Sequence, residues 1–135
     1  MPTQKSKDNI SIAIITYNEA SNIGNCIQSA KMLGPMVVVD SGSTDGTVEI
    51  ISSTEAKLFA HPWVNFSIQK QYAVDNCTTD WVLILDADER LTPQLIEEIN
   101  KLVLDDPAIA YVIPRRSFFL NTEVKHCGWT PDYVL

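Results

Sequence analysis

Short apolar runs alternate with amphipathic segments along most of this chain. The runs SIAIIT (11–16), MVVVD (36–40) and WVLILD (81–86) are nearly continuous in apolar residues, and KLFA (57–60) is a weaker fourth run. A strand with such a pattern is buried on both faces, as in a parallel sheet that helices cover on both sides. The alternation of strand and helix therefore predicts an α/β fold with a mostly parallel sheet.

The segments after the first two runs carry helix patterns. Four apolar residues follow the spacing i, i+3, i+4, i+7 of an amphipathic helix: Ile23, Cys26, Ile27 and Ala30. A second helix is expected over about residues 45–54. Its N-cap candidates are Ser43, Thr44 and Asp45, because short polar side chains accept hydrogen bonds from the free N–H groups of a first helical turn.

The later part of the chain continues the alternation. Residues 67–77 read as a helix that leads into the run at 81–86. A further helix is expected after Thr92, with Pro93 at its first position, where the missing N–H of proline costs nothing. Residues 111–113 predict another short strand.

Polar, acid-bearing segments follow three of the four apolar runs. They are TYNE (16–19), DSGSTDG (40–46) and DADE (86–89). Ligands of parallel α/β sheets bind at the carboxyl ends of the strands, where such loops meet. Each segment alone is explained by ordinary turn and capping chemistry, but three at one sheet edge predict a binding site.

The DAD sequence at 86–88 indicates a divalent cation. In an extended segment residues i and i+2 point the same way, so Asp86 and Asp88 can address one ligand. Carboxylate pairs suit Mg²⁺ or Mn²⁺, which take few carboxylates and add phosphate oxygens of the substrate. The alternative is that Asp88 only caps the turn that follows.

The other two segments allow a nucleotide. Asp40 ends its strand and can hydrogen-bond a nucleobase or ribose, whereas turn chemistry with Gly42 and Gly46 is the structural alternative. A phosphatase of the haloacid dehalogenase type requires a second Asp two residues after the first, a position that Gly42 occupies here. For Asn18 and Glu19 taken alone, an ordinary cap and first helical turn, where the helix dipole favours acids, is the better explanation.

Composition narrows the function classes. The chain of 135 residues has 17 Asp and Glu against 10 Lys and Arg, a net charge of −7, which argues against nucleic acid as a partner. Three scattered cysteines predict reduced thiols rather than a disulfide framework. No apolar run is long enough to span a membrane, and the N-terminus lacks an apolar signal core, so we expect a cytoplasmic protein. Residues 1–10 are expected to form a flexible arm and residues 11–135 one domain. Because the chain stops inside the apolar PDYVL, we expect that domain to be the N-terminal part of a longer protein.

Taken together in order and spacing, these segments resemble family 2 glycosyltransferases, which have the GT-A fold. Three segments carry the resemblance: IITYNEASNIGNCIQS (14–29), VVVDSGSTDGTVEI (37–50) and WVLILDADERLTPQL (81–95). The later HPWVNFSIQKQYAV (61–74) and the tail at 111–135 are similar to bacterial enzymes that add glucose to the lipopolysaccharide or lipooligosaccharide core. These are β-1,4-glucosyltransferases.

The resemblance implies a role for each residue of the predicted site. Residues 16–19, that is Thr16, Tyr17, Asn18 and Glu19, would hold the base and ribose of a UDP-sugar. Asp40 would bond the uracil, and Lys70 would lie near the base or the diphosphate. Asp86 would contact ribose or the metal, and Asp88 would ligate a divalent cation, Mg²⁺ or Mn²⁺.

The resemblance also implies an inverting transfer to a saccharide or lipid-linked saccharide acceptor. Asp132 is the candidate general base, although it departs from the Glu-Asp pair of the wider family. Peripheral contact with the inner face of the membrane would fit a glycolipid acceptor. Two alternatives stay open: a nucleotide-sugar-binding module without turnover, and a different Mg²⁺ enzyme such as a phosphatase or nucleotidyltransferase.

Overall fold

The structure is a computed structural model that describes residues 9–102, 110–119, 122–124 and 132–134. The chain divides into two compact units, residues 1–103 and residues 104–135, which are described separately below. In the part of the chain that the structure describes, no helix is both long enough and apolar enough to cross a membrane.

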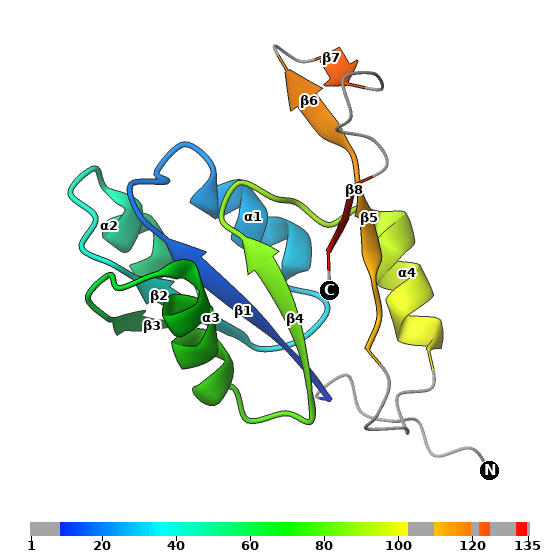
Figure 1. The fold of residues 1–135 in the computed structure, drawn as a ribbon, viewed down its shortest axis with the longest axis horizontal. Helices are drawn as coiled ribbons and strands as arrows, with labels where there is room; N and C mark the ends of the chain where they lie inside the picture. The colour runs from blue at the N-terminus through cyan, green and yellow to red at the C-terminus, as the bar shows by residue number, and fades with distance from the viewer. Residues whose placement is uncertain (1–8, 103–109, 120–121, 125–131, 135) are drawn as a thin grey trace. The chain divides into compact units, whose positions relative to one another are not determined.

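The first unit is built on a four-stranded sheet. Its strands are β1 (Ile10–Thr16), β2 (Met36–Asp40), β3 (Lys57–Ala60) and β4 (Trp81–Asp86). They lie in the order β3-β2-β1-β4, and all three pairings are parallel (Figure 1). This confirms the α/β fold with a parallel sheet that the alternating runs predict.

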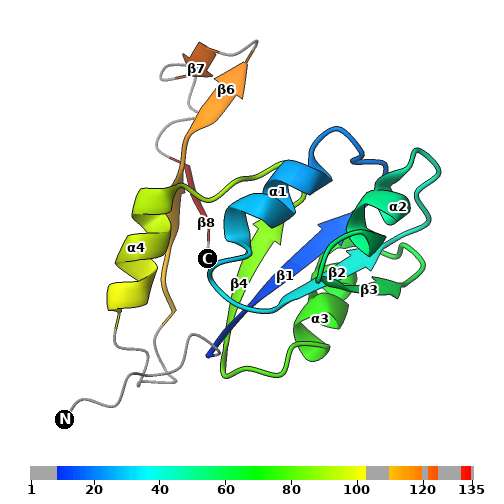
Figure 2. The same cartoon turned by 180° about the vertical axis from the view of Figure 1, so that it is seen from behind.

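Helices cover both faces of this sheet. One face carries α1 (Ile23–Ala30) and α2 (Thr47–Ser52), and the other carries α3 (Phe66–Asp75), as Figures 1 and 2 show from opposite sides. A fourth helix, α4 (Pro93–Lys101), follows the loop after β4.

The strands contribute alternate residues to two cores. Ile12 and Ile14 of β1 pack with Val38 against the buried face of α1 and α2, whereas Ala13 packs with its neighbours against α3. Both isoleucines are fully buried. Burying such a side chain contributes about 1.5–3 kcal/mol, so these two faces fix the register of the sheet.

The expected helix start at Thr92 and Pro93 is confirmed, and α3, expected over residues 67–77, begins at Phe66 and ends at Asp75. The side chain of Thr92 accepts a hydrogen bond from the N–H of Leu95 at 3.1 Å, and Pro93 begins α4. At α3, the Asn65 side chain caps the first turn by accepting from the N–H of Ile68 at 2.9 Å.

The expected N-cap of α2 is wrong. The N-cap is Gly46, with a φ of 97°, and not Ser43, Thr44 or Asp45. Asp45 still does part of a cap's work from the preceding position, because its Oδ1 accepts from the N–H of Thr47 at 3.1 Å. Gly46 takes the left-handed backbone conformation that this arrangement requires and that favours glycine.

The second unit contains two short antiparallel pairs. β5 (Ile113–Arg115) pairs with β8 (Asp132–Val134), and β6 (Ser117–Phe119) pairs with β7 (Thr122–Val124). The strand expected at 111–113 therefore begins two residues later than the sequence pattern predicts.

Candidate functional site

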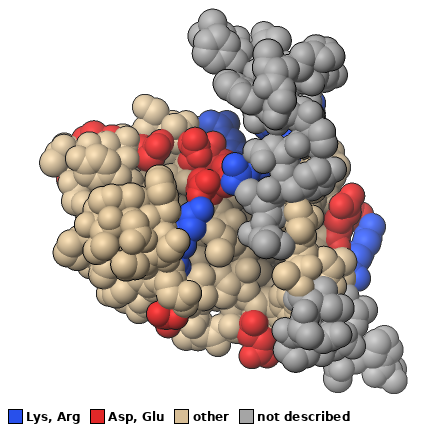
Figure 3. Space-filling model, viewed as in Figure 1, with Lys and Arg blue, Asp and Glu red and all other residues tan. Residues whose placement is uncertain are grey.

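Three strand ends of the sheet lie at the same level. Thr16 of β1 pairs with Asp40 of β2, and the preceding residue, Ile15, pairs with Asp86 of β4. Because the strands are parallel and end in register, the loops after β1, β2 and β4 share one rim. Figure 3 shows acidic side chains gathered along this part of the surface.

A cavity of about 710 Å³ opens at this rim. Six of the predicted site residues line it: Thr16, Tyr17, Glu19, Lys70, Asp86 and Asp88. A volume of this size is typical of a small-molecule site. Two predicted residues, Asn18 and Asp40, are not among those that line the cavity.

Asp40 is engaged by its own loop. Its Oδ2 accepts from the backbone N–H groups of Gly42 and Ser43, each at 2.9 Å, and its Oδ1 accepts from the Ser43 hydroxyl. The residue is 4% exposed. The turn chemistry considered as the alternative in the sequence is therefore present, and Ser41 lines the cavity beside it.

A carboxylate–hydroxyl relay, by which we mean a hydroxyl that donates to a carboxylate and accepts from a backbone N–H, connects this loop to the loop after β1. The Ser43 hydroxyl that donates to Asp40 also accepts from the N–H of Asn18 at 2.8 Å. In return, the Asn18 side chain accepts from the N–H of Thr44 at 2.8 Å. Asn18 has a φ of 50°, a left-handed conformation that Asn tolerates better than most residues.

A second relay of the same kind lies one turn further along. The Thr47 hydroxyl donates to Asp45 Oδ1 and accepts from the N–H of Glu19 at 2.9 Å. Asp45 Oδ2 accepts from the N–H of Ala20 at 3.1 Å. The Thr47 hydroxyl bond lowers the pKa of the Asp45 carboxyl below its usual value. Both relays fix the backbone that presents Tyr17 and Glu19 to the cavity.

The three carboxylates of the acidic segment after β4 have different surroundings. Glu89 Oε1 accepts from the N–H of Asp86 at 2.8 Å, and the Glu89 N–H donates to the Asp86 carbonyl at 2.9 Å, so Glu89 closes the turn. The Asp86 carboxylate forms an ion pair with Lys70 at 3.4 Å. Asp88 is exposed at the cavity.

A buried thiol lies beneath this turn. Cys26 is fully buried, and its Sγ donates to the Asp86 carbonyl at 3.4 Å. Burial, followed by the charges of Glu89, Asp88 and Asp86, raises the pKa of Cys26 to about 12. The thiol is therefore neutral at physiological pH. Cys26 and Cys77 are free, as predicted, and Cys127 lies outside the described residues.

The side chains at the rim fit a two-carboxylate cation site. Among the described residues, no three His, Cys, Asp or Glu side chains converge as ligands. Asp86 and Asp88 line one cavity, which is the carboxylate set that Mg²⁺ or Mn²⁺ uses when substrate phosphates complete its shell.

Thr16, at the end of β1, borders the cavity and has a buried hydroxyl. The residue is 5% exposed, and its Oγ1 has no hydrogen-bond partner among the described residues. An unmet buried polar group of this kind costs about 1–3 kcal/mol of stability.

Six residues that line the cavity were not predicted from the sequence: Ile15, Ser41, Trp63, Phe66, Gln69 and Ala87. The sequence pointed to some of them only by their nearness to Lys70 and Asp40. The aromatic residues were overlooked because an aromatic residue near the start of a helix usually indicates core packing. Asp132, the candidate base, begins β8, but the position of its side chain lies outside what the structure describes.

Comparison with known proteins supplies the family. A family model described as "Glycosyl transferase family 2" matches residues 11–131. The chain belongs to glycosyltransferase family 2. Two relatives of this family 2 chain carry related names. The lipopolysaccharide core biosynthesis glycosyltransferase LpsC of Rhizobium meliloti is 34% identical over 131 residues, which are 93% of this chain and 47% of that protein. An uncharacterised glycosyltransferase of Rickettsia felis is 41% identical over 110 residues, 78% of this chain and 39% of that protein.

Solved structures give the fold of this family 2 chain. The mannosyltransferase PcManGT of Pyrobaculum calidifontis, in complex with GDP-Man and Mn²⁺, matches with a TM-score of 0.63 and 22% identity, over 85% of this chain and 38% of that one. Glucosyl-3-phosphoglycerate synthase of Mycobacterium tuberculosis, in complex with UDP, matches with a TM-score of 0.53 and 23% identity, over 64% and 36%. These likenesses identify the GT-A fold. The family 2 chain spans less than half the length of the two curated relatives.

Proposed function

We propose that this chain carries the donor site of an inverting, metal-dependent glycosyltransferase. The enzyme moves a sugar, glucose in our proposal, from a UDP-sugar to a saccharide or lipid-linked saccharide of the cell envelope. One observation carries the proposal: Asp86, Asp88, Lys70 and Thr16 line a single cavity at the carboxyl ends of parallel strands.

The loop after β1 holds the nucleoside in this proposal. Thr16, Tyr17 and Glu19 all border the cavity. Asn18 and Asp40 act through the loops they shape, because their side chains are hydrogen-bonded within the relays. Lys70 supplies positive charge to the diphosphate once that group competes with Asp86 for the ammonium.

Asp88 and Asp86 would hold the divalent cation. Such a cation offsets negative charge that builds up on the departing diphosphate. The structure of PcManGT with Mn²⁺ supports this assignment by analogy of fold.

The transfer is a single displacement at the anomeric carbon of the donor sugar. A base removes the proton from the acceptor hydroxyl, and the oxygen forms a bond to C1 while the bond from C1 to the diphosphate oxygen breaks. Attack opposite the leaving group inverts the configuration at C1. We assign the base to Asp132, and Asp132→Asn should remove transfer while leaving UDP binding intact.

The relatives support the envelope glycan as destination. LpsC is named for lipopolysaccharide core biosynthesis, and its match covers 93% of this chain and 47% of LpsC. A cytoplasmic location with peripheral contact at the membrane is our proposal for an enzyme that meets a glycolipid acceptor.

Calorimetry tests the donor and the metal together. UDP, GDP and UDP-glucose are titrated with and without Mn²⁺ into the wild type, Asp88→Asn and Asp80→Asn. Asp80 is an exposed acid just before β4, at the opposite end of that strand from Asp88, and serves as the matched control. We expect uridine nucleotides to bind, Mn²⁺ to strengthen binding, and only Asp88→Asn to remove the metal effect.

The outcomes separate the alternatives. Binding of UDP-glucose without transfer to any glycan acceptor would identify a nucleotide-sugar-binding module. Binding of simple phosphate esters with no preference for a nucleoside would indicate a different Mg²⁺ enzyme and contradict the proposal. A metal effect that persists in Asp88→Asn would refute the role of that residue.

A further inference from the structure

Besides Tyr17, two aromatic residues that line the cavity are exposed. Trp63 is 49% exposed and Phe66 is 67% exposed, yet both line the cavity. Their rings meet edge to face, with centroids 4.9 Å apart and planes at 86°. Leaving large apolar rings in water gives up the free energy of burying them, so their exposure in a defined arrangement requires a reason.

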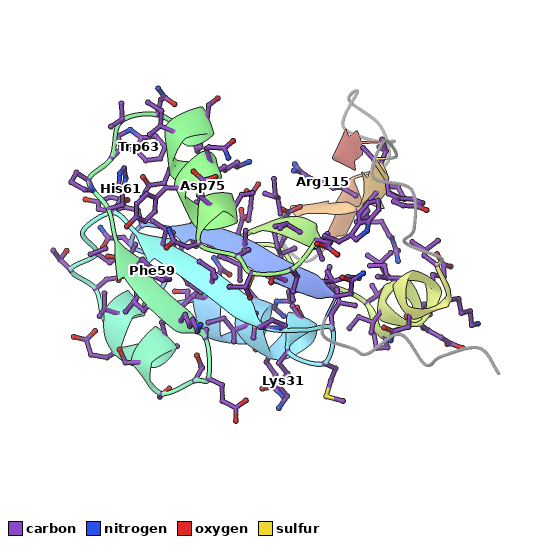
Figure 4. The ribbon with its side chains drawn as sticks, turned by 90° about the horizontal axis from the view of Figure 1, so that it is seen from below. Lys31, Phe59, His61, Trp63, Asp75 and Arg115 are labelled. Carbon is purple, nitrogen blue, oxygen red and sulfur yellow. The ribbon has the colours of Figure 1, made fainter. Side chains whose placement is uncertain are left out.

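A buried amide holds the segment that carries these rings. Gln69 is 1% exposed, and both polar atoms of its side chain bond to His61. The amide nitrogen donates to the His61 carbonyl at 3.1 Å, and the amide oxygen contacts the ring Nδ1 at 2.9 Å. The segment between β3 and α3 is thereby closed onto the helix (Figure 4).

Further contacts anchor the same segment to the sheet. The His61 N–H donates to the Asp40 carbonyl at 3.0 Å, and the His61 ring stacks on Tyr72 at 4.2 Å. Asn65 then caps α3 at the residue before Phe66. The backbone on both sides of Trp63 is therefore fixed, and the exposed rings sit on a rigid support.

The cavity changes character from one part of its lining to another. Residues 62–69 contain no charged residue, and within this segment Trp63 and Phe66 add aromatic surface to the lining, to which Tyr17 also contributes. Lys70 follows Phe66 by one helical turn, on the same face of α3, and pairs with Asp86. Aromatic faces next to opposite charges match a molecule with a planar apolar ring joined to anionic groups.

We propose that Trp63 and Phe66 form the stacking site for the base of the donor nucleotide. The inference rests on the proposed function and names the residues that grip the base. It also accounts for the state of Asp40, whose carboxylate is bonded within its own turn and does not line the cavity. Stacking on the two rings supplies the binding energy for the base, and Lys70 receives the diphosphate.

Separating the base from its phosphates tests the proposal. UDP and inorganic pyrophosphate, each with Mn²⁺, are titrated into the wild type, Trp63→Ala and Trp63→Phe. Stacking contributes about 1–3 kcal/mol per base, so Trp63→Ala should weaken UDP between about 5-fold and 150-fold. Pyrophosphate affinity should not change, and Trp63→Phe should restore most of the UDP affinity.

Val64→Ala is the matched control, because Val64 is 57% exposed in the same segment but does not line the cavity. The emission of Trp63 supplies a second readout. UDP should quench it in the wild type and in Val64→Ala, whereas Trp63→Phe should lose that quenching although Trp81 and Trp129 remain.

Each outcome decides for or against the stacking site. Equal loss of UDP and pyrophosphate in Trp63→Ala would show that the ring only supports the loop, and unchanged UDP affinity would exclude stacking. If the wild type prefers GDP to UDP and Trp63→Ala weakens both, the uridine assignment fails and the stacking site stands. A wild type that binds pyrophosphate but no nucleotide would overturn both proposals.

Discussion

The side-chain hydroxyl of Thr47 accepts a hydrogen bond from the backbone N–H of Glu19 at 2.9 Å, across 28 positions of sequence, while it donates to Asp45. Thr47 is fully buried. One hydroxyl therefore satisfies a backbone donor of the loop after β1 and a carboxylate of the loop after β2. This bond helps to shape the cavity, because Glu19 lines it.

Replacing Thr47 by valine should destabilise the fold. Thr47→Val keeps the side-chain shape but leaves the Glu19 N–H and Asp45 short of a partner, at a cost of about 1–3 kcal/mol in the free energy of unfolding. Urea denaturation measures the change. Thr47→Ser keeps the hydroxyl and should lose less than half as much stability as Thr47→Val. A loss in Thr47→Ser as large as that in Thr47→Val would contradict the role given to the hydroxyl.

Lys70 should matter far more for ligand binding than for stability. Its ion pair with Asp86 joins side chains that are 34% and 35% exposed, so Lys70→Met should cost less than about 1 kcal/mol of stability. A charge-assisted contact to the diphosphate is worth more, and UDP affinity should fall about 10-fold or more. Calorimetry and thermal unfolding give the two values.

Lys101→Met is the control for Lys70, because Lys101 pairs with Glu97 at 3.1 Å on the exposed side of α4. It should leave UDP affinity unchanged. If the two variants weaken UDP to the same extent, a general effect of net charge explains the result and Lys70 has no place in the site.

Replacing Gly46 and Gly24 by alanine should change the free energy of unfolding in opposite directions. Gly46 has a φ of 97° and no heavy atom within 4 Å of an added Cβ, so Gly46→Ala should lose about 1–2 kcal/mol through backbone strain alone. Gly24 lies inside α1, where an added Cβ would meet Ile50 Cγ2 at 3.5 Å, an ordinary contact. Gly24→Ala should gain about 0.5–1 kcal/mol. Urea denaturation of both variants checks the signs.

Because of the buried thiol of Cys26, the free energy of unfolding should fall at alkaline pH. Burial raises the pKa of Cys26 from 9.0 to about 12, so the native thiol stays protonated where the unfolded thiol ionises. The resulting stability is complete below pH 9.0 and is lost as the pH rises towards about 12.

The measurement compares urea midpoints at about pH 8 and about pH 10.5. The wild type should lose stability between them, and Cys26→Ala should lose less, since it has no thiol to ionise when the chain unfolds. Cys77→Ala is the control, because Cys77 is only half-buried and should keep most of the slope. Identical slopes in the wild type and Cys26→Ala would contradict the assignment.

The sheet could be predicted from the sequence because its signal is local. Each of the runs at 36–40, 57–60 and 81–86 is a strand with those bounds, since a continuous apolar run has few other stable environments. The start of α2 could not be predicted in this way. Three neighbouring polar residues compete for the cap, and the choice depends on hydrogen bonds to Asn18 and Glu19, which are distant in sequence.

The site shows the same division. Asp86 and Asp88 follow a buried strand, which is enough to bring them to the rim. The sequence could not tell that Asp40 turns its carboxylate into its own loop, or that Glu89 closes a turn while Asp88 lines the cavity. Trp63 was missed because its exposure depends on the contact between Gln69 and His61, which no pattern in the sequence announces.

The level ending of the strands makes the pocket intolerant of length changes. Thr16 lies opposite Asp40, and Asp40 lies opposite Ala60, so the loops leave the sheet from a common line. Inserting one residue within β1 would advance its end by about 3.3 Å and turn every following side chain to the opposite face. We therefore expect the strands to accept substitutions more readily than insertions or deletions. Insertions and deletions should be tolerated at the other end of the strands, where β1 and β4 begin.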